Sequence, residues 1–362
     1  MLTRRPPGQL LFSARTVLEA VAPLAVGLVG GLLFERVGLP APWISGSMVA
    51  VAAVSARWPL QDLHPALRDL AMLLGGSTMG AAVTPETLRL FGTMPVSFAG
   101  LFVSIVATML LCSLWLRLAL GWRGSDALLA SAPGALSAVL ALAAERGADV
   151  TRIAVVQALR LFALVAVLPG LVAWIEPGMQ GDAGAGGTTG GVMDAPAFAF
   201  VLLIGLGLGA TFARAGIAAP FLLGAAIGNA VPHGADLVRG LPPGPVQVLG
   251  FVLIGVFIAG RMQGIGLATL RRHLVAGLGS LLLGLAVSAV FAGLVAWAVD
   301  VRFGAALLAF APGGIEALAI LSLALDLDPL YVAAHHLMRF FAIGLALPLI
   351  MPLFDRLRAP DG

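Results

Sequence analysis

The chain has 362 residues, of which 60% are hydrophobic and 11% are charged, and its formal net charge at pH 7 is +3. Because a soluble domain carries about 25% charged residues, this composition excludes a water-soluble protein and indicates an integral membrane protein. The basic residues are all arginines, scattered one or two at a time, so the sequence offers no basic stripe for nucleic acid.

Each half of the chain contains six hydrophobic segments. They cover residues 16–35, 41–57, 68–83, 93–118, 125–146 and 150–174 in the first half, and 196–214, 218–232, 245–262, 273–299, 303–325 and 328–354 in the second. Their apolar runs do not alternate, and backbone groups in lipid must bond within their own segment, so we predict an all-α, polytopic transmembrane bundle. Three segments are shorter than the roughly 20 residues that a span needs, which leaves re-entrant, paired and tilted helices open.

The two halves of the chain are related in sequence. The run Gly31–Gly38, followed by Pro42, returns as Gly209–Gly216, followed by Pro220, at a constant offset (209 − 31 = 220 − 42 = 178). Many transporters are built from such internal repeats and hold their site at the repeat interface. We predict a first membrane repeat over 16–175, a Gly-rich linker over 176–196 and a second membrane repeat over 197–355. Five crossings per repeat would invert the repeats and six would make them parallel, and both stay open.

Matched helix breaks are the sharpest local signal. The run Ala130–Ala135 returns as Ala309–Gly314 at nearly the same offset (309 − 130 = 179). The breaking residues, which lie in the middle of segments 125–146 and 303–325, are Pro133, Gly134, Pro312, Gly313 and Gly314. Proline removes a helix hydrogen bond and glycine frees the backbone, so we predict broken helices whose half-helix ends face a ligand at mid-depth. A purely structural kink is the alternative.

Polar residues accompany the breaks. Ser131 and Ser137 flank the first break, and Glu316 occupies the position that matches Ser137 (316 − 137 = 179). A carboxylate inside a hydrophobic span is a functional candidate because its burial is expensive, and Glu316 would suit a proton carrier. The alternative is a structural ion pair with an arginine.

Two arginines provide candidate cations for an anion. Arg160 and Arg339 each follow an aspartate at the same spacing (160 − 149 = 339 − 328 = 11). At 1.5 Å per residue this is about 16 Å, near the middle of a bilayer core about 30 Å thick. Gln157 and His336 precede them by three residues on the same helix face. A guanidinium there suits bidentate binding of a carboxylate or phosphate, or it bonds carbonyls at broken helix ends; both interpretations stay open.

No motif points to an enzyme, a metal or a cofactor. His335 and His336 are adjacent, so they point to different helix faces, and the remaining histidines lie at segment ends. We found no nucleophile elbow, phosphate-binding loop or dinucleotide fingerprint. We therefore expect no catalytic residue, no metal and no cofactor.

Several motifs resemble the bacterial AbrB-type membrane protein family. They are the duplicated pattern at Gly30–Gly46, the run Ser131–Gly134 and the run Glu145–Arg152, and the resemblance covers about residues 18 to 355. It implies a duplicated membrane domain, and members are often labelled regulators of gene expression or ammonia monooxygenases. The second label needs copper ligands, which the sparse histidines do not supply. The second repeat departs from the motif at Ala218–Phe221, so we expect the halves to differ in role.

These observations favour a secondary transporter in the bacterial inner membrane that carries a small, anionic solute with proton coupling. Its site would lie at the interface of the two repeats, and its partners would be the bilayer and the solute, with no nucleic acid. A homo-oligomer stays open. The alternatives are a membrane-embedded regulator of gene expression that acts through a partner and, disfavoured, a membrane oxidoreductase.

Overall fold

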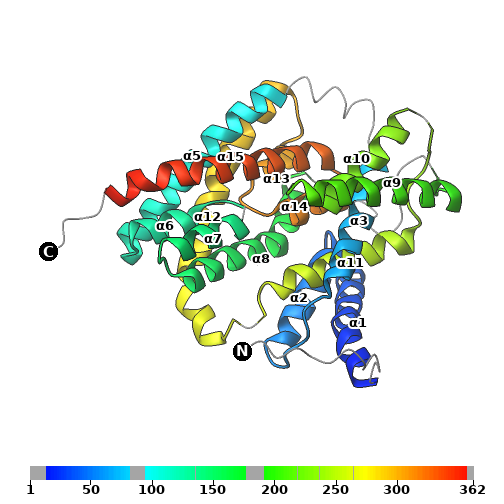
Figure 1. The fold of residues 1–362 in the computed structure, drawn as a ribbon, viewed down its shortest axis with the longest axis horizontal. Helices are drawn as coiled ribbons and strands as arrows, with labels where there is room; N and C mark the ends of the chain where they lie inside the picture. Colours follow the sequence, from blue (N-terminus) through cyan, green and yellow to red (C-terminus); the bar gives the residue numbers. More distant parts are fainter. Residues whose placement is uncertain are drawn as a thin grey trace.

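A computed structural model describes residues 14–81, 94–134, 136–176, 191–217, 219–235, 237–263 and 265–356. Over these ranges the chain is helical, apart from one isolated bridge between Val192 and Leu241, so the predicted all-α fold is confirmed (Figure 1). The helices are α1 (Ala14–Val37), α2 (Pro42–Ser55), α3 (Pro65–Ala81), α5 (Met94–Leu120), α6 (Gly124–Ser131), α7 (Leu136–Glu145), α8 (Val150–Ile175), α9 (Ala195–Arg214), α10 (Pro220–Gly234), α11 (Gly244–Gly260), α12 (Leu267–Val299), α13 (Phe303–Phe310), α14 (Ile315–Ala324) and α15 (Pro329–Arg356).

Four of the described helices are long and apolar enough to cross a membrane, namely 94–120, 150–175, 195–214 and 268–299. Two tryptophans mark the ends of such helices: Trp174 near the end of α8 is 79% exposed, and Trp297 near the end of α12 is 86% exposed. Tryptophan concentrates where hydrocarbon meets headgroups, so these exposures fit helix ends at a membrane interface.

Local sequence explains where several helices begin. Asp149 and Asp194 cap α8 and α9, and their carboxylates accept from the amides three residues on at 2.9 and 2.8 Å. Helices α2 and α10 instead begin with Pro42 and Pro220, whose fixed φ suits a first helical position. Cap and proline signals of this kind place a helix start within a residue or two.

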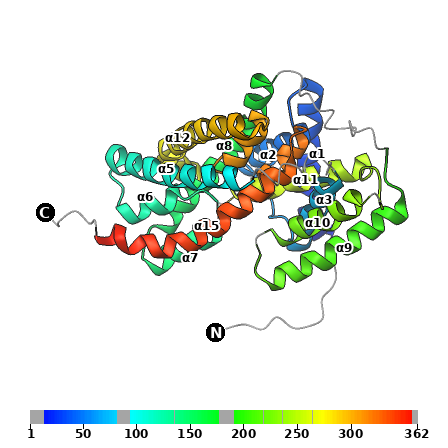
Figure 2. The same ribbon diagram turned by 90° about the horizontal axis from the view of Figure 1, so that it is seen from above.

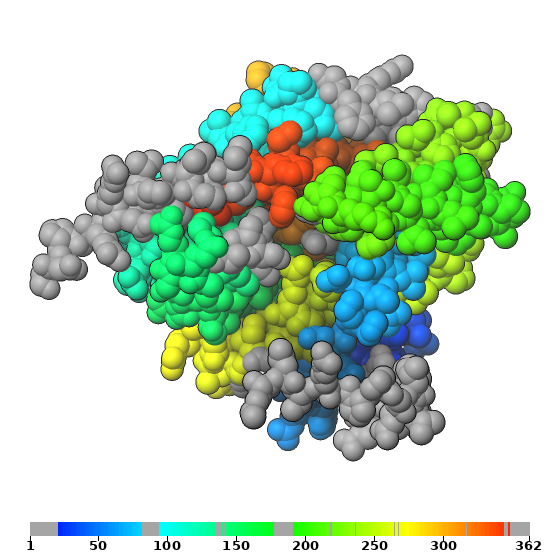
Figure 3. Space-filling model, viewed as in Figure 1, coloured from blue at the N-terminus to red at the C-terminus, as the bar shows by residue number. Residues whose placement is uncertain are grey.

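The helices form two groups, and each group draws on both halves of the sequence (Figures 1 and 2). One group contains α1 to α3 with α9 to α11, and the other contains α5 to α8 with α12 to α15. Glycines allow close contact inside the first group: Gly76 of α3 lies against the backbone of Leu222 in α10, and Gly255 of α11 lies against the backbone of Ile44 in α2. On the face drawn in Figure 3, α15 is visible between α5 and α9.

Helices α5 and α12, which occupy matching places in the two halves, run in opposite directions. Gly100, near the start of α5, faces Val295, near the end of α12. Trp115, near the end of α5, faces Gly279, near the start of α12. Helices α5 and α12 are therefore antiparallel, although they occupy equivalent positions in the sequence.

Helices α13 and α14 form a hairpin, which we call hairpin B (303–324). Arg302, just before α13, donates to the carbonyl of Asp326, just after α14, at 3.1 Å. Glu176 at the end of α8 accepts from the amide of Gly304 at 2.6 Å and pairs with Arg302 at 3.5 Å. The chain therefore enters and leaves hairpin B at one end of the bundle, and the break at 311–314 is its tip.

Helices α6 and α7 form the matching hairpin A (124–145), which begins at the equivalent place in the first repeat (303 − 124 = 179). At its base, the guanidinium of Arg152 at the start of α8 lies 4.4 Å from the ring centroid of Trp122, just before α6. The sequence predicted helices that break at these residues and that cross or face each other near mid-membrane. In the structure the chain turns back at each break, because the proline and glycines let the second half-helix fold beside the first.

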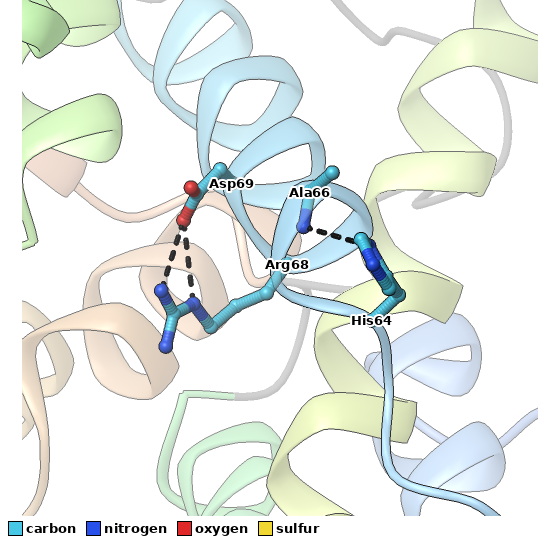
Figure 4. Close-up of polar contacts among 4 residues, drawn as sticks. All are labelled: His64, Ala66, Arg68 and Asp69. Carbon is cyan, nitrogen blue, oxygen red and sulfur yellow. Dashed lines mark hydrogen bonds and ion pairs between the residues drawn. The ribbon is translucent and has the colours of Figure 1, made fainter. Parts of the chain in front are cut away.

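The N-terminal end of α3 carries an exposed arginine that pairs with a neighbouring carboxylate (Figure 4). Arg68 pairs with Asp69 at 3.2 Å, and both side chains are well exposed. His64 accepts a hydrogen bond from the amide of Ala66 at 3.2 Å at the helix start. The interior arginines described next lie in a very different environment.

Candidate functional site

The tips of hairpins A and B touch each other. A Cβ built on Gly134 would lie 3.4 Å from the carbonyl oxygen of Gly313. Gly134 has φ +79°, a left-handed conformation that other residues rarely adopt. Pro133, Pro312 and Gly313 are buried, whereas Gly134 and Gly314 are half-buried. The two breaks predicted from the sequence are thus neighbours in space.

A guanidinium from α8 covers the last carbonyls of α6. Arg160 donates from Nη2 to Ala132 at 2.9 Å and from Nη1 to Ser131 at 3.4 Å and Ala130 at 3.5 Å. Its side chain is 2% exposed. The carbonyls at the end of a helix have no partner within it, so Arg160 supplies donors where the chain leaves the helix.

A second guanidinium repeats the arrangement in hairpin B. Arg339 of α15 donates from Nη2 to Ala309 at 2.7 Å and from Nη1 to Ala311 at 2.5 Å, and it is 1% exposed. These acceptors match Ala130 and Ala132 at the repeat offset (309 − 130 and 311 − 132 are both 179). The Nε of Arg339 is buried and has no hydrogen-bond partner among the described residues.

One further side chain holds each half-helix. Gln157 donates to Leu129 at 3.0 Å, and His336 bonds Leu308, the matching carbonyl, through Nε2 at 3.0 Å. The other ring nitrogen of His336 lies 3.3 Å from Nη1 of Arg339. The ends of α6 and α13 are therefore each anchored by two neighbouring side chains of a long helix.

The charged side chains described at the two tips, Arg160 and Arg339, are both positive. Each guanidinium offsets the partial negative charge at the C-terminal end of α6 or α13. The N-terminal ends of α7 and α14 start from the same tips, and their first amides lack intrahelical partners. Gly314, the N-cap of α14, has no side chain with which to cap these amides. Over the described residues, neither Arg160 nor Arg339 pairs with a carboxylate, and such a combination favours an anion.

Most of the predicted site residues gather at these tips. Those on hairpin A and α8 are Ser131, Pro133, Gly134, Gln157 and Arg160, and those on hairpin B and α15 are Pro312, Gly313, Gly314, His336 and Arg339. The Ser131 hydroxyl donates to Ala127 at 2.6 Å within its own helix. Ser137 and Glu316 are the second residues of α7 and α14, but their side chains lie outside the described part of the structure.

The sequence left open whether the arginines bind an anion or bond carbonyls at broken helix ends. The carbonyl bonds are present at both sites. Binding of an anion near the same guanidiniums stays a prediction. Within the described ranges, no three His, Cys, Asp or Glu side chains gather as metal ligands.

Sequence reasoning missed a buried polar network beside hairpin B. The Ser97 hydroxyl of α5 lies 2.5 Å from the Tyr331 hydroxyl and 2.6 Å from Nε2 of His335. The Nδ1 of His335 lies 2.7 Å from the Tyr331 carbonyl. All three residues are buried, and the matching positions 276, 152 and 156 are Ala, Arg and Val. A serine near the start of a hydrophobic segment gave no signal that it would meet this pair.

The chain matches a family model and a known protein over most of its length. A family model described as "Transition state regulatory protein AbrB" matches residues 43–355. The uncharacterized protein YhjN of Bacillus subtilis (strain 168) is 26% identical over 354 residues, and the match covers 90% of each chain.

Proposed function

This chain belongs to the AbrB family, and from that premise we propose that it is a multi-pass inner-membrane transporter that carries a small anion. The observation that carries the proposal is the meeting of hairpin tips at Gly134 and Gly313, with a buried guanidinium behind each tip. Non-helical backbone at membrane depth is tolerated where it is buried in protein or lines a cavity. Tips that are electropositive and partly accessible suit an anion site.

Helix directions support an inverted topology for this transporter. Helices α5 and α12 are antiparallel, and both ends of each hairpin lie at one end of the bundle. If the hairpins turn back inside the bilayer, each repeat makes five crossings, through α1, α2, α3, α5 and α8 or their counterparts. With ten crossings in all, the second repeat is inverted in the membrane relative to the first. Transporters with inverted repeats hold their sites near the midplane of the bilayer.

The arginines and Glu316 take separate roles in the proposal. Arg160 and Arg339 already donate to carbonyls, so they supply charge to the anion while the first amides of α7 and α14, which lack intrahelical partners, contact it. Glu316 is the second residue of α14, near the positive end of that helix. Its role as a proton carrier stays a prediction.

A ligand panel tests the proposal directly. The purified protein in detergent would be unfolded thermally with formate, acetate, succinate, phosphate or sulfate, each against chloride at equal ionic strength. A ligand that binds only the native state raises its stability by about 2.7 kcal/mol at 100 times its Kd, so we expect at least one anion to raise Tm above the chloride control. A panel without any such shift would contradict anion binding.

A regulator of gene expression is the second candidate, because the family description names a regulatory protein. Such a regulator acts through a partner rather than a solute. A specific protein captured by the detergent-solubilised chain, together with an inert anion panel, would favour this candidate over transport.

A further inference from the structure

The two hairpin tips differ at one matched position. Gln157 and His336 occupy equivalent places in the two repeats (336 − 157 = 179) and bond matching carbonyls, Leu129 and Leu308. Both side chains are buried, with 6% and 3% exposed. They make the same bond to the half-helix, but only histidine can become positively charged by taking up a proton. Hairpin B therefore has a chemical property that hairpin A lacks.

The contacts of His336 determine which ring nitrogen carries the hydrogen. The Leu308 carbonyl can only accept, so Nε2 donates to it. A guanidinium can only donate, so Nδ1 accepts from Nη1 of Arg339 at 3.3 Å. The ring is thus neutral in this arrangement. A proton added to Nδ1 would give the ring a positive charge. The N–H groups and the positive charges of His336 and Arg339 would then face each other.

The surroundings of His336 contain no described negative charge that would offset this proton. Arg339 and His335 lie on the same helix, and the charge of Arg160 on α8 acts on Arg339. Helix α13, which His336 contacts, has no titratable residue. Glu316 on α14 is the nearby acid in sequence, and its side chain lies outside the described structure. An anion at the tips would place a negative charge near the ring.

We infer that His336 is the proton-binding site that couples proton binding to anion binding at the tip of hairpin B. The inference rests on the proposed function. Protonation of Nδ1 releases Nη1 of Arg339 from the ring and adds one positive charge at the tip, which strengthens the attraction for an anion. By linkage, the bound anion favours the proton by the same factor. Anion binding is then accompanied by proton uptake, of at most one proton per anion.

The test compares His336→Gln with the unmodified protein. Glutamine can donate to Leu308 as Gln157 donates to Leu129, and its oxygen can accept from Arg339, so the variant should fold. Calorimetric titration with the anion panel at about pH 8 and pH 5.5 gives affinities. Sulfate and formate are included because both stay ionised over this range, and two buffers of different ionisation enthalpy give the protons taken up. His64→Gln, at an exposed position (Figure 4), is the matched control.

We expect the unmodified protein and His64→Gln to bind anion more tightly at the lower pH, by a factor of up to about 150, with proton uptake on binding. His336→Gln should bind with no pH dependence and no proton uptake. Anion binding without proton uptake in the unmodified protein, or pH dependence that survives in His336→Gln and disappears in Glu316→Gln, would overturn the inference and leave the proposed function intact. No binding at either pH would overturn both.

Discussion

Exchanging Arg160 and Arg339 together for glutamine is expected to abolish the stabilisation of the protein by anions. The two guanidiniums are the buried cations at the hairpin tips, and each is almost fully shielded from solvent. Charge is screened far less in such surroundings than at a surface. The guanidiniums attract the anion by their charge while the amides contact it, so the double variant should lose measurable affinity for every anion in the panel.

The same variant is expected to be less stable without any ligand. Each guanidinium bonds at least two carbonyls at the end of a half-helix, and glutamine can replace one of these bonds. A hydrogen bond to a charged group contributes about 1.5–3 kcal/mol, so the free energy of unfolding should fall by roughly that amount per site. Thermal unfolding in detergent, with and without anion, measures both effects in one experiment.

Two control variants distinguish the loss of positive charge from the loss of hydrogen bonds to the helix-end carbonyls. Arg68→Gln removes an arginine from the exposed pair with Asp69 and should change neither stability nor the anion response appreciably (Figure 4). The double lysine variant keeps both charges but loses the planar fork, so it should be destabilised and still respond to anions. A folded double glutamine variant that responds to anions like the unmodified protein would show that the arginines are structural caps alone.

The position of the hairpin tips could be read from the sequence, but the path of the chain could not. Helix α6 ends at Ser131, two residues before Pro133, and α13 ends at Phe310, two before Pro312. Proline and glycine set where a helix stops, because they act on the local hydrogen-bond ladder. They do not set the angle at which the next helix leaves. That angle depends on distant contacts, such as the bond from Arg302 to Asp326.

For the arginines too, the position along the helix could be predicted from the sequence and the bonding partners could not. Their spacing from Asp149 and Asp328 predicts a depth near the middle of the bilayer core, because a helix has a fixed rise. Their partners are backbone carbonyls, which every residue possesses and which leave no mark in a sequence. The helix breaks allowed carbonyl bonding as one of two interpretations, and the repeat offset indicated that both guanidiniums would meet matching acceptors. The Ser97–Tyr331–His335 network had no counterpart in the first repeat, so even that hint was lacking.

Substituting Gly76 by alanine is expected to destabilise the protein severely, because it blocks the contact between α3 and α10. A Cβ at this position would overlap the backbone oxygen of Leu222, and backbone cannot swing aside as a long side chain can. The two helices must separate, and the neighbouring bond from Asn229 to the Ser77 carbonyl would stretch with them. Overpacking of this kind costs typically 1–3 kcal/mol, and we expect the upper end, about 3 kcal/mol.

The repeat supplies a second position for this test, and α9 supplies a control. Gly255 of α11 faces the backbone oxygen of Ile44 at 2.6 Å from its built Cβ, so Gly255→Ala should also destabilise. Gly207 of α9 is exposed with no atom within 4 Å of its built Cβ, and alanine there should be neutral or stabilise by up to about 1 kcal/mol. Thermal unfolding in detergent ranks the three variants. Gly76→Ala and Gly255→Ala could instead unfold at the same temperature as Gly207→Ala. In that case direct backbone contact does not hold α3 to α10 and α11 to α2, and side chains must hold the first helix group together.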